Sequence, residues 1–327
     1  MRDIGHEETD ELIRQLEKKL NVEYGQATQD VAQKLAEYMR SFKKKDEAWR
    51  LRVKSGEASE KDYQNWRKNQ LMIGERWERM KETLARDWMN TNAIARSMIL
   101  GYMPEAYALN FNFATYGIEH DARVDTSFTL YSRETVERLM RDNPEILPPP
   151  GKRIMTLAEQ QKIILWQKGQ IQSVTLQAIL QGESIDRMAN RIARTLGEYN
   201  HADSVRYART AMNEAQNAGR QAAFERGASK GIKMRRTWVA TLDGRTRHEH
   251  RMLDGQTVAL DEPFKVDGYE IRYPGDPSAP GYLIWNCRCT MIRQIQGFEK
   301  DISDKSLRNT DNMGDMTYEE WKEAKAK

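Results

Sequence analysis

The stretch WVATLDGRTRHEHRMLDG, residues 238–255, decides the fold of the C-terminal part of this chain. It opens with an apolar run led by Trp238 and contains two Asp-Gly pairs, which favour tight turns because glycine accepts a positive φ without steric cost. Similar short runs, rich in valine, isoleucine, threonine and aromatic residues, lie on both sides of it. They predict strands at 235–241, 256–260, 269–273 and 282–294. The sequence therefore predicts a small mixed α+β module.

Upstream of this module the sequence has a helical period. From Glu8 to about Gly101, apolar residues recur at spacings of three and four, with a turn at 55–57 and a new helix capped by Ser59. We interpret one apolar stripe as a helix-packing seam, made of Trp66, Ile73, Trp77, Met80, Leu84 and Trp88. Further helices are predicted at 156–180, after an N-cap at Ser184, at 203–226 and at 317–326.

The helical pattern breaks between Gly101 and Gly151, where Pro104 and then Pro148-Pro149-Pro150 occur. Three consecutive prolines cannot continue a helix and form a stiff connector. We therefore divide the chain into an elongated helical region at 1–150, helices plus the α+β module at 151–298, and a polar tail with a short helix at 299–327. The expected fold class is α+β, with a mostly helical N-terminal region.

The charge balance argues against strong non-specific DNA binding. The 327 residues carry 52 Lys and Arg against 49 Asp and Glu, so no global positive field exists. The apolar segment 93–103 is interrupted by Arg96 and is shorter than the roughly 20 residues that cross a bilayer. The chain also begins without a secretory signal pattern. We therefore expect a protein made in a cytoplasm, without a membrane partner and with its two cysteines reduced.

These two cysteines, Cys287 and Cys289, form with His250 a set of ligands that suits zinc, and His248 or Asp243 is available as a fourth. A structural zinc would tie the turn after the first strand to the last strand of the module. Against this, side chains one residue apart in a regular strand point to opposite faces. The alternative, which the sequence favours, is a pair of buried thiols beside a hydrogen-bonded histidine.

The order of motifs resembles the Mu F-like family of phage head-morphogenesis proteins. The resemblance spans about residues 180–295 and combines a Trp-led strand, an Asp-x-Arg-x-Arg-x-x-His turn, an Asp-Gly pair, a Pro/Gly/Asp loop and a closing Asn-Cys-Arg-Cys. The residues that carry it are Trp238, Asp243, Arg245, Arg247, His250, Asp254, Gly255, Pro274, Asn286, Cys287, Arg288 and Cys289.

This resemblance implies a virion protein: a minor head, or minor capsid, component of a tailed bacteriophage, located at the portal vertex and capsid interior. Its implied partners are the portal protein and the major capsid or scaffold protein. The implied role is head morphogenesis, extending to DNA packaging or ejection.

Two groups of arginines invite a nucleic-acid interpretation. Arg245, Arg247 and Arg251 lie near Asp243, and we interpret this group as an internal ion-pair network, with phosphate contact as the alternative. Another set shares one helix face and supplies the candidates for contact with packaged DNA, although such a face is more often simply solvated. Its members are Arg187, Arg191 and Arg194.

No catalytic template fits, so we expect no enzymatic activity. His248-Glu249-His250 lacks the histidine spacing of zincins, and Asn-Cys-x-Cys departs from the Pro-Cys-x-x-Cys of zinc deaminases. The alternative function is a metal-dependent nuclease, or toxin-like phage protein, that uses His248, His250 and Asp243, since phosphodiester hydrolysis requires little beyond a metal and a base.

Overall fold

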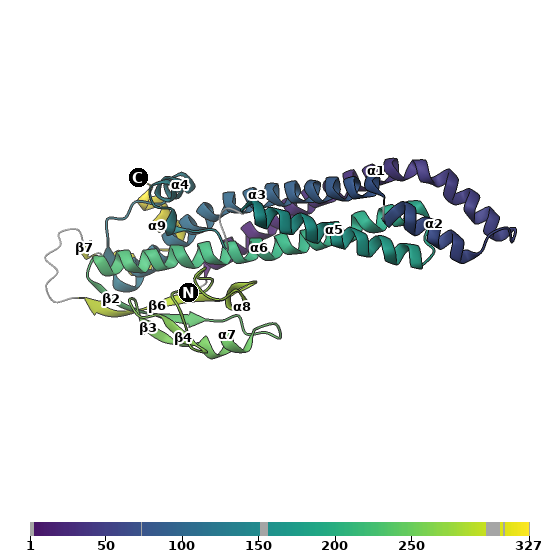
Figure 1. Ribbon diagram of the computed structural model, residues 1–327. Coiled ribbons are helices and arrows are strands. Elements are labelled where there is room, and N and C mark those ends of the chain that lie inside the picture. The colour runs from purple at the N-terminus through teal and green to yellow at the C-terminus, as the bar shows by residue number, and fades with distance from the viewer. Residues whose placement is uncertain (1–2, 73, 151–155, 299–307, 310, 327) are drawn as a thin grey trace. The chain divides into compact units, whose positions relative to one another are not determined.

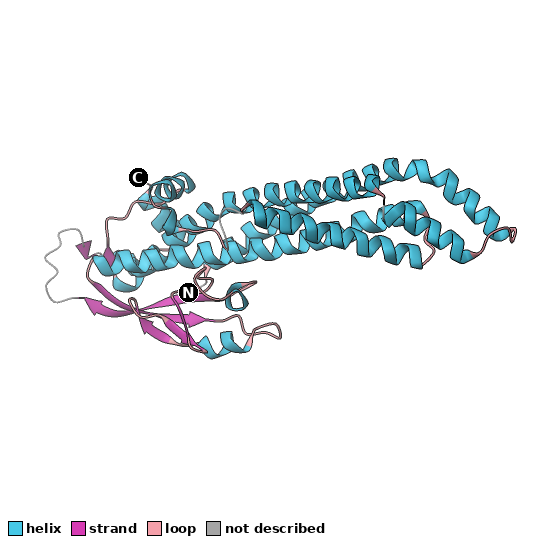
Figure 2. Cartoon of the chain, in the orientation of Figure 1, coloured by secondary structure: helices cyan, strands magenta, loops and turns pink. Residues whose placement is uncertain are grey.

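The computed structural model describes residues 3–72, 74–150, 156–298, 308–309 and 311–326, most of which are helical (Figure 1, Figure 2). The long helices are α1 (Ile4–Lys54), α2 (Glu60–Met72), α3 (Glu75–Ala122), α5 (Leu157–Leu180) and α6 (Ile185–Ser229). The short helices are α4 (Arg133–Asp142), η1 (Pro144–Ile146), α7 (His248–Leu253), α8 (Gly281–Ile284), η2 (Asp311–Asp315) and α9 (Tyr318–Lys325). The strands are β1 (Val124–Asp125), β2 (Ile232–Val239), β3 (Thr257–Ala259), β4 (Phe264–Val266), β5 (Tyr269–Ile271), β6 (Thr290–Phe298) and β7 (Arg308–Asn309). The predicted α+β class is confirmed.

The chain forms two compact units, each made of separate stretches of sequence. Unit 1 comprises Met1–Leu16, Met98–Arg153 and Arg206–Lys327, whereas unit 2 comprises Glu17–Ser97 and Ile154–Val205. Helices α1, α3 and α6 each contribute residues to both units. These units differ from the predicted regions 1–150, 151–298 and 299–327, and the boundaries at 150 and 298 stay a prediction.

Unit 2 consists of helices joined by short turns in its described residues. Trp77, Leu84 and Trp88 from the predicted seam are fully buried, and Tyr24 stacks on Trp88 with the ring centroids 6.4 Å apart. Of the other seam members, Trp66 and Met80 are partly exposed and Ile73 lies outside the described residues. The buried residues confirm that this stripe packs helices together. No described helix of the chain is long and apolar enough to cross a membrane.

In unit 1, α3 and α6 approach each other closely along small residues. Ala208, Met212 and Ala215 are fully buried on α6. A Cβ atom placed on Gly219 would lie 2.4 Å from the backbone oxygen of Tyr107 on α3. Position 219 therefore requires glycine, because only glycine leaves room for that carbonyl group.

The principal sheet of unit 1 is antiparallel and has the strand order β3-β2-β6. Its register pairs Trp238 with Met291 and Thr237 with Thr257. Strands β4 and β5 form a separate hairpin, closed by Asp267-Gly268 with φ values of 51° and 79°. Two consecutive positive φ values are typical of the tight turns that match the twist of a hairpin.

Helix α9 fixes the end of the chain to α3 within unit 1. The short helix predicted at 317–326 is present, and Thr317 caps it and forms a reciprocal capping box with Glu320. The indole Nε1 of Trp321 donates to the buried carboxylate of Glu119 at 2.6 Å, and the Lys325 ammonium lies 3.1 Å from the same carboxylate. The short C-terminal helix is therefore an anchored part of the unit.

The structure overturns three local predictions. Helix α3 continues through Pro104, because the surrounding residues are buried and tertiary packing offsets the roughly 3 kcal/mol cost of an interior proline. Helix α6 is continuous where two helices were expected; within unit 2, Gly197 and Asn200 contact neighbouring helices and do not form a turn. The strand expected at 282–294 is instead α8, a loop and then β6.

Candidate metal centre

The module places α7 against its sheet through one aromatic side chain. Trp238 of β2 is buried and meets the His250 ring edge-on at a centroid distance of 6.1 Å and the Phe264 ring at 5.2 Å. Asp254 ends α7 and accepts a hydrogen bond from the Ala240 backbone at 2.8 Å. The helix that carries His250 is thus fixed at the face that bears this histidine and at its C-terminal end.

Three buried ligand atoms converge beside this helix. Nδ1 of His250 lies 3.2 Å from Sγ of Cys289 and 3.7 Å from Sγ of Cys287, and all three ligand atoms lie within 4.8 Å of one another. In a tetrahedral zinc site with ordinary bond lengths, nitrogen and sulfur ligands are separated by about 3.6 Å. The two distances bracket that value, so this group could hold a metal ion.

The objection that the two thiols should face opposite ways does not apply, because they do not lie in a strand. Strand β6 begins at Thr290, after both cysteines. Asn286 adopts a φ of 56°, and the Cys287 amide bonds back to the Ile284 carbonyl at 3.1 Å. This turn brings both sulfur atoms to the same side as His250. The predicted strand was wrong because a left-handed residue interrupts it, a conformation that asparagine tolerates better than most residues.

The histidine ring is oriented by a backbone group. Nε2 of His250 lies 2.9 Å from the Leu283 carbonyl oxygen. A carbonyl can only accept, so Nε2 carries the proton, and the neutral ring then presents the lone pair of Nδ1 to the sulfur atoms. Metal-binding histidines commonly have such an outer hydrogen bond, which fixes the tautomer and the ring plane.

The two cysteines are linked by a hydrogen bond from the Cys289 amide to Sγ of Cys287 at 3.4 Å. The interaction between the two thiols lowers the pKa of the Cys289 thiol and, together with burial, raises the pKa of the Cys287 thiol. A metal that binds both sulfur atoms displaces their protons, so metal binding at this pair depends on pH.

The cysteine loop is fixed on α6 by three polar side chains. The side-chain amides of Asn213 and Asn217 both donate to the Cys289 carbonyl, at 2.9 and 3.1 Å, and the Thr210 hydroxyl accepts from the Asn286 amide at 3.1 Å. Their spacing of three and four residues places them on one face of α6. These positioning residues were not predicted as part of the site, although their helical spacing was visible in the sequence.

The charged turn before α7 is an internal network, as the sequence favoured. Arg288 forms two hydrogen bonds with Asp243, at 2.7 and 2.8 Å, and these hold the pKa of the Asp243 carboxyl well below its ordinary value. Arg251 donates to the Asp243 carbonyl at 2.8 Å, and Arg247 donates to the Trp285 carbonyl. Arg245 remains largely exposed.

The remaining predicted site residues lie apart from the three ligand atoms. His248 is exposed, and neither it nor Asp243 joins the group of ligand atoms. Gly255 has a φ of 76°, and its amide donates to the Trp238 carbonyl, which explains the Asp-Gly pair. Pro274 is buried in the loop after β5.

The three arginines proposed to contact DNA lie in unit 2. Arg187 and Arg194 are exposed, whereas Arg191 bonds to Glu183 at 2.7 Å. Contact of this helix face with DNA therefore stays a prediction.

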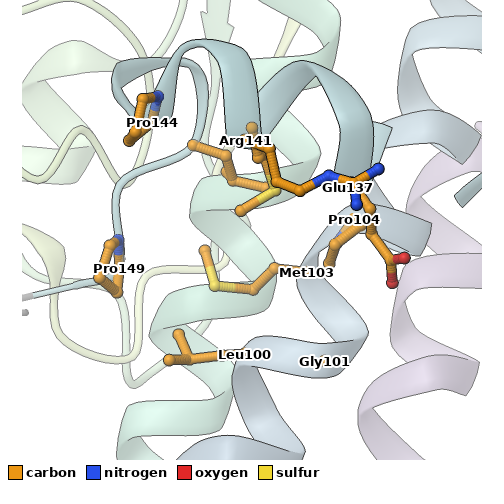
Figure 3. A pocket seen from close by; sticks show the side chains of 10 residues that line it. Leu100, Gly101, Met103, Pro104, Glu137, Arg141, Pro144 and Pro149 are labelled. Carbon is orange, nitrogen blue, oxygen red and sulfur yellow. The ribbon is translucent and has the colours of Figure 1, made fainter. Parts of the chain in front are cut away.

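Unit 1 also has an apolar hollow of about 560 Å³ between α3, α4 and the proline-rich segment (Figure 3). Figure 3 shows Met103 and Pro104 of α3 facing it, with Arg141 and Glu137 of α4 alongside. Its lining offers one carboxylate, that of Glu137, and contains no histidine or cysteine. The convergent chemistry of the described residues therefore lies at His250 and the two cysteines.

The region that contains the ligand group also matches a known protein family. Residues 169–292, which include the whole ligand group, match the family described as phage Mu protein F like protein. Through this region the chain is similar to the phage Mu F-like family, and the family resemblance expected from the sequence is confirmed.

Two relatives extend the match beyond that region. Minor head protein GP7 of Bacillus phage SPP1 is 29% identical over 226 residues, which cover 67% of this chain and 69% of GP7. The NAD(+)--arginine ADP-ribosyltransferase EFV of Enterococcus faecalis is 25% identical over 226 residues, which cover 68% of this chain. The match spans only 44% of that second relative's length. No solved structure matches the chain.

Proposed function

We propose that this chain is a minor head component of a tailed bacteriophage that acts in head morphogenesis at the portal and capsid interior. The observation that carries the proposal is the Mu F-like region, in which His250, Cys287 and Cys289 form one buried group in unit 1. The similarity to a minor head protein over two thirds of the chain supports the same role. Partners would be the portal protein and the major capsid or scaffold protein, and contact with packaged DNA belongs to the same proposal.

Coexpression tests this role. The full chain is produced with the portal, scaffold and major capsid proteins of its own phage, and assembled particles are isolated by sedimentation. We expect the chain in the particles in few copies. Normal particles that exclude the wild-type chain would contradict the proposal.

Zinc is the metal that this ligand set favours, because two thiolates and one imidazole select a soft or borderline ion. It would join α7 to the cysteine loop and stabilise a module that has little core of its own. His250→Ala should remove the metal, and His248→Ala is the matched control, because His248 is exposed in the same helix. Equal zinc content in the two variants would refute the assignment.

We further propose that the chain acts without catalysis. The nuclease hypothesis requires His248 and Asp243 at the metal, yet His248 is exposed and Arg288 holds Asp243. The purified chain is incubated with DNA and RNA in the presence of divalent metals, and with NAD+ and an arginine-rich protein, because one relative is named for that transfer. We expect no product. Turnover that is lost in His250→Ala would contradict this proposal.

A further inference from the structure

A small cavity opens next to the three ligand atoms. It has a volume of about 20 Å³ and lies within unit 1, where its lining includes His250, Cys287 and Cys289. A cavity needs about 10–15 Å³ to accept one water molecule. The space therefore accepts one oxygen-sized ligand atom beside the proposed metal, and nothing larger.

The three side chains leave the fourth coordination position of a tetrahedral metal ion without a histidine, cysteine or carboxylate ligand. Across the described ranges of the chain, no fourth histidine, cysteine, aspartate or glutamate joins the three. Structural zinc sites are closed by four protein ligands, whereas sites with three protein ligands keep an exchangeable position for water or another small ligand. The ligand count and the adjoining cavity point to the second kind.

The mouth of this cavity is positively charged. Its lining contains Arg245, Arg247 and Arg288, and the nearest carboxylate, Asp243, is already held by both nitrogen donors of Arg288. Arg247 donates to the Trp285 carbonyl and Arg245 is largely exposed. The lining thus carries three guanidinium groups and no carboxylate, and two thiolates would balance the charge of a divalent metal. A guanidinium group presents several donors in a plane that matches the oxygen atoms of a phosphate.

We infer that the metal centre has an exchangeable fourth position and binds an oxyanion of the phosphate class there. One anionic oxygen enters the cavity and reaches the metal, and the rest of the anion stays outside among the arginines. The lining contains no carboxylate and no histidine other than the ligand, so the site has no base to activate water and binds without hydrolysis. This inference rests on the metal centre proposed above.

Cobalt substitution tests the inference on the full chain. Cobalt(II) replaces zinc, and its visible ligand-field spectrum is recorded while azide, inorganic phosphate or dimethyl phosphate is added. We expect a saturable spectral change with azide and with at least one phosphate. Inorganic phosphate alone would indicate a free or terminal phosphate as the natural ligand, whereas dimethyl phosphate would indicate a phosphodiester backbone.

Variants separate the oxyanion site from the metal site. Arg245→Gln should weaken phosphate binding about threefold to tenfold, the effect of one partly screened charge, without changing cobalt uptake. Arg194→Gln, an exposed arginine of unit 2, is the control and should change neither. A cobalt spectrum that no anion alters would show that the protein supplies the fourth ligand and would overturn the inference. A response to azide without a response to either phosphate would overturn the oxyanion assignment. Failure to bind cobalt would instead refute the metal centre itself.

Discussion

Gly219→Ala tests whether α3 and α6 meet as closely as the structure shows. The added Cβ atom would lie 2.4 Å from the Tyr107 oxygen and 3.2 Å from the Phe111 amide nitrogen, whereas ordinary contacts begin near 3.4 Å, so the helices must separate by roughly 1 Å. Overpacking of this kind costs about 2–3 kcal/mol, and the better helix propensity of alanine returns about 1 kcal/mol. We therefore expect the free energy of unfolding to fall by about 1–2 kcal/mol.

A matched glycine in the same unit supplies the control. Gly101 lies inside α3, and a Cβ atom there meets only the end of the Arg133 side chain, at 4.0 Å. Gly101→Ala should therefore stabilise unit 1 by about 0.5–1 kcal/mol. Urea unfolding followed by circular dichroism measures both variants. If Gly219→Ala stabilised the protein as much as Gly101→Ala, the close approach of the two helices would be refuted.

Three further predictions concern charge and metal. Burial, with a smaller contribution from Asp276, raises the pKa of Glu214 to about 9, and neither of its oxygens has a hydrogen-bond partner among the described residues. Because the pKa of this carboxyl is higher in the folded state than its unfolded value of about 4.5, the protein is most stable below that pH. Its free energy of unfolding then falls as pH rises towards 9, by up to about 1.4 kcal/mol per pH unit. Glu214→Gln should remove that slope from the pH dependence of the melting temperature, and an unchanged slope would refute the assignment. Lys325→Met leaves the buried Glu119 carboxylate without its cation and should cost about 3 kcal/mol in guanidinium unfolding, whereas Lys322→Met at an exposed pair should cost almost nothing. Chelation should lower the melting temperature of the wild type, because a metal that binds only the folded state stabilises it by about 2.7 kcal/mol at 100 times its Kd; equal melting curves with and without chelator would contradict this.

Much of the module could be predicted from the sequence because its signals are local. The Asp-Gly pairs at 254–255 and 267–268 predict the turns, and the last residues predict the short helix α9. Cysteine and histidine are recognisable ligands wherever they occur, so the three members of the metal group could be named without coordinates.

The choice between the two histidines depends on helix α7, a segment that the sequence predicts as a turn. His248 and His250 lie two residues apart in α7, and such residues do not share a helix face. Only one of them could therefore face the sheet and the thiols. The structure shows that it is His250, which contacts Trp238.

Other features depended on contacts that have no local signature. The continuation of α3 through Pro104 follows from burial of the surrounding helix, which the proline itself does not reveal. The orientation of the His250 ring depends on the Leu283 carbonyl, a group that every residue possesses. The left-handed turn at Asn286 decides the direction of both thiols, yet asparagine adopts that conformation only at a minority of its positions.

The central claim is that a metal bound by His250, Cys287 and Cys289 holds the Mu F-like module together. X-ray absorption at the zinc edge of the purified full chain measures those ligands directly. We predict two sulfur ligands at about 2.3 Å and one imidazole nitrogen at about 2.0 Å, with one lighter ligand completing the tetrahedron. A zinc spectrum containing only oxygen and nitrogen ligands would contradict the claim.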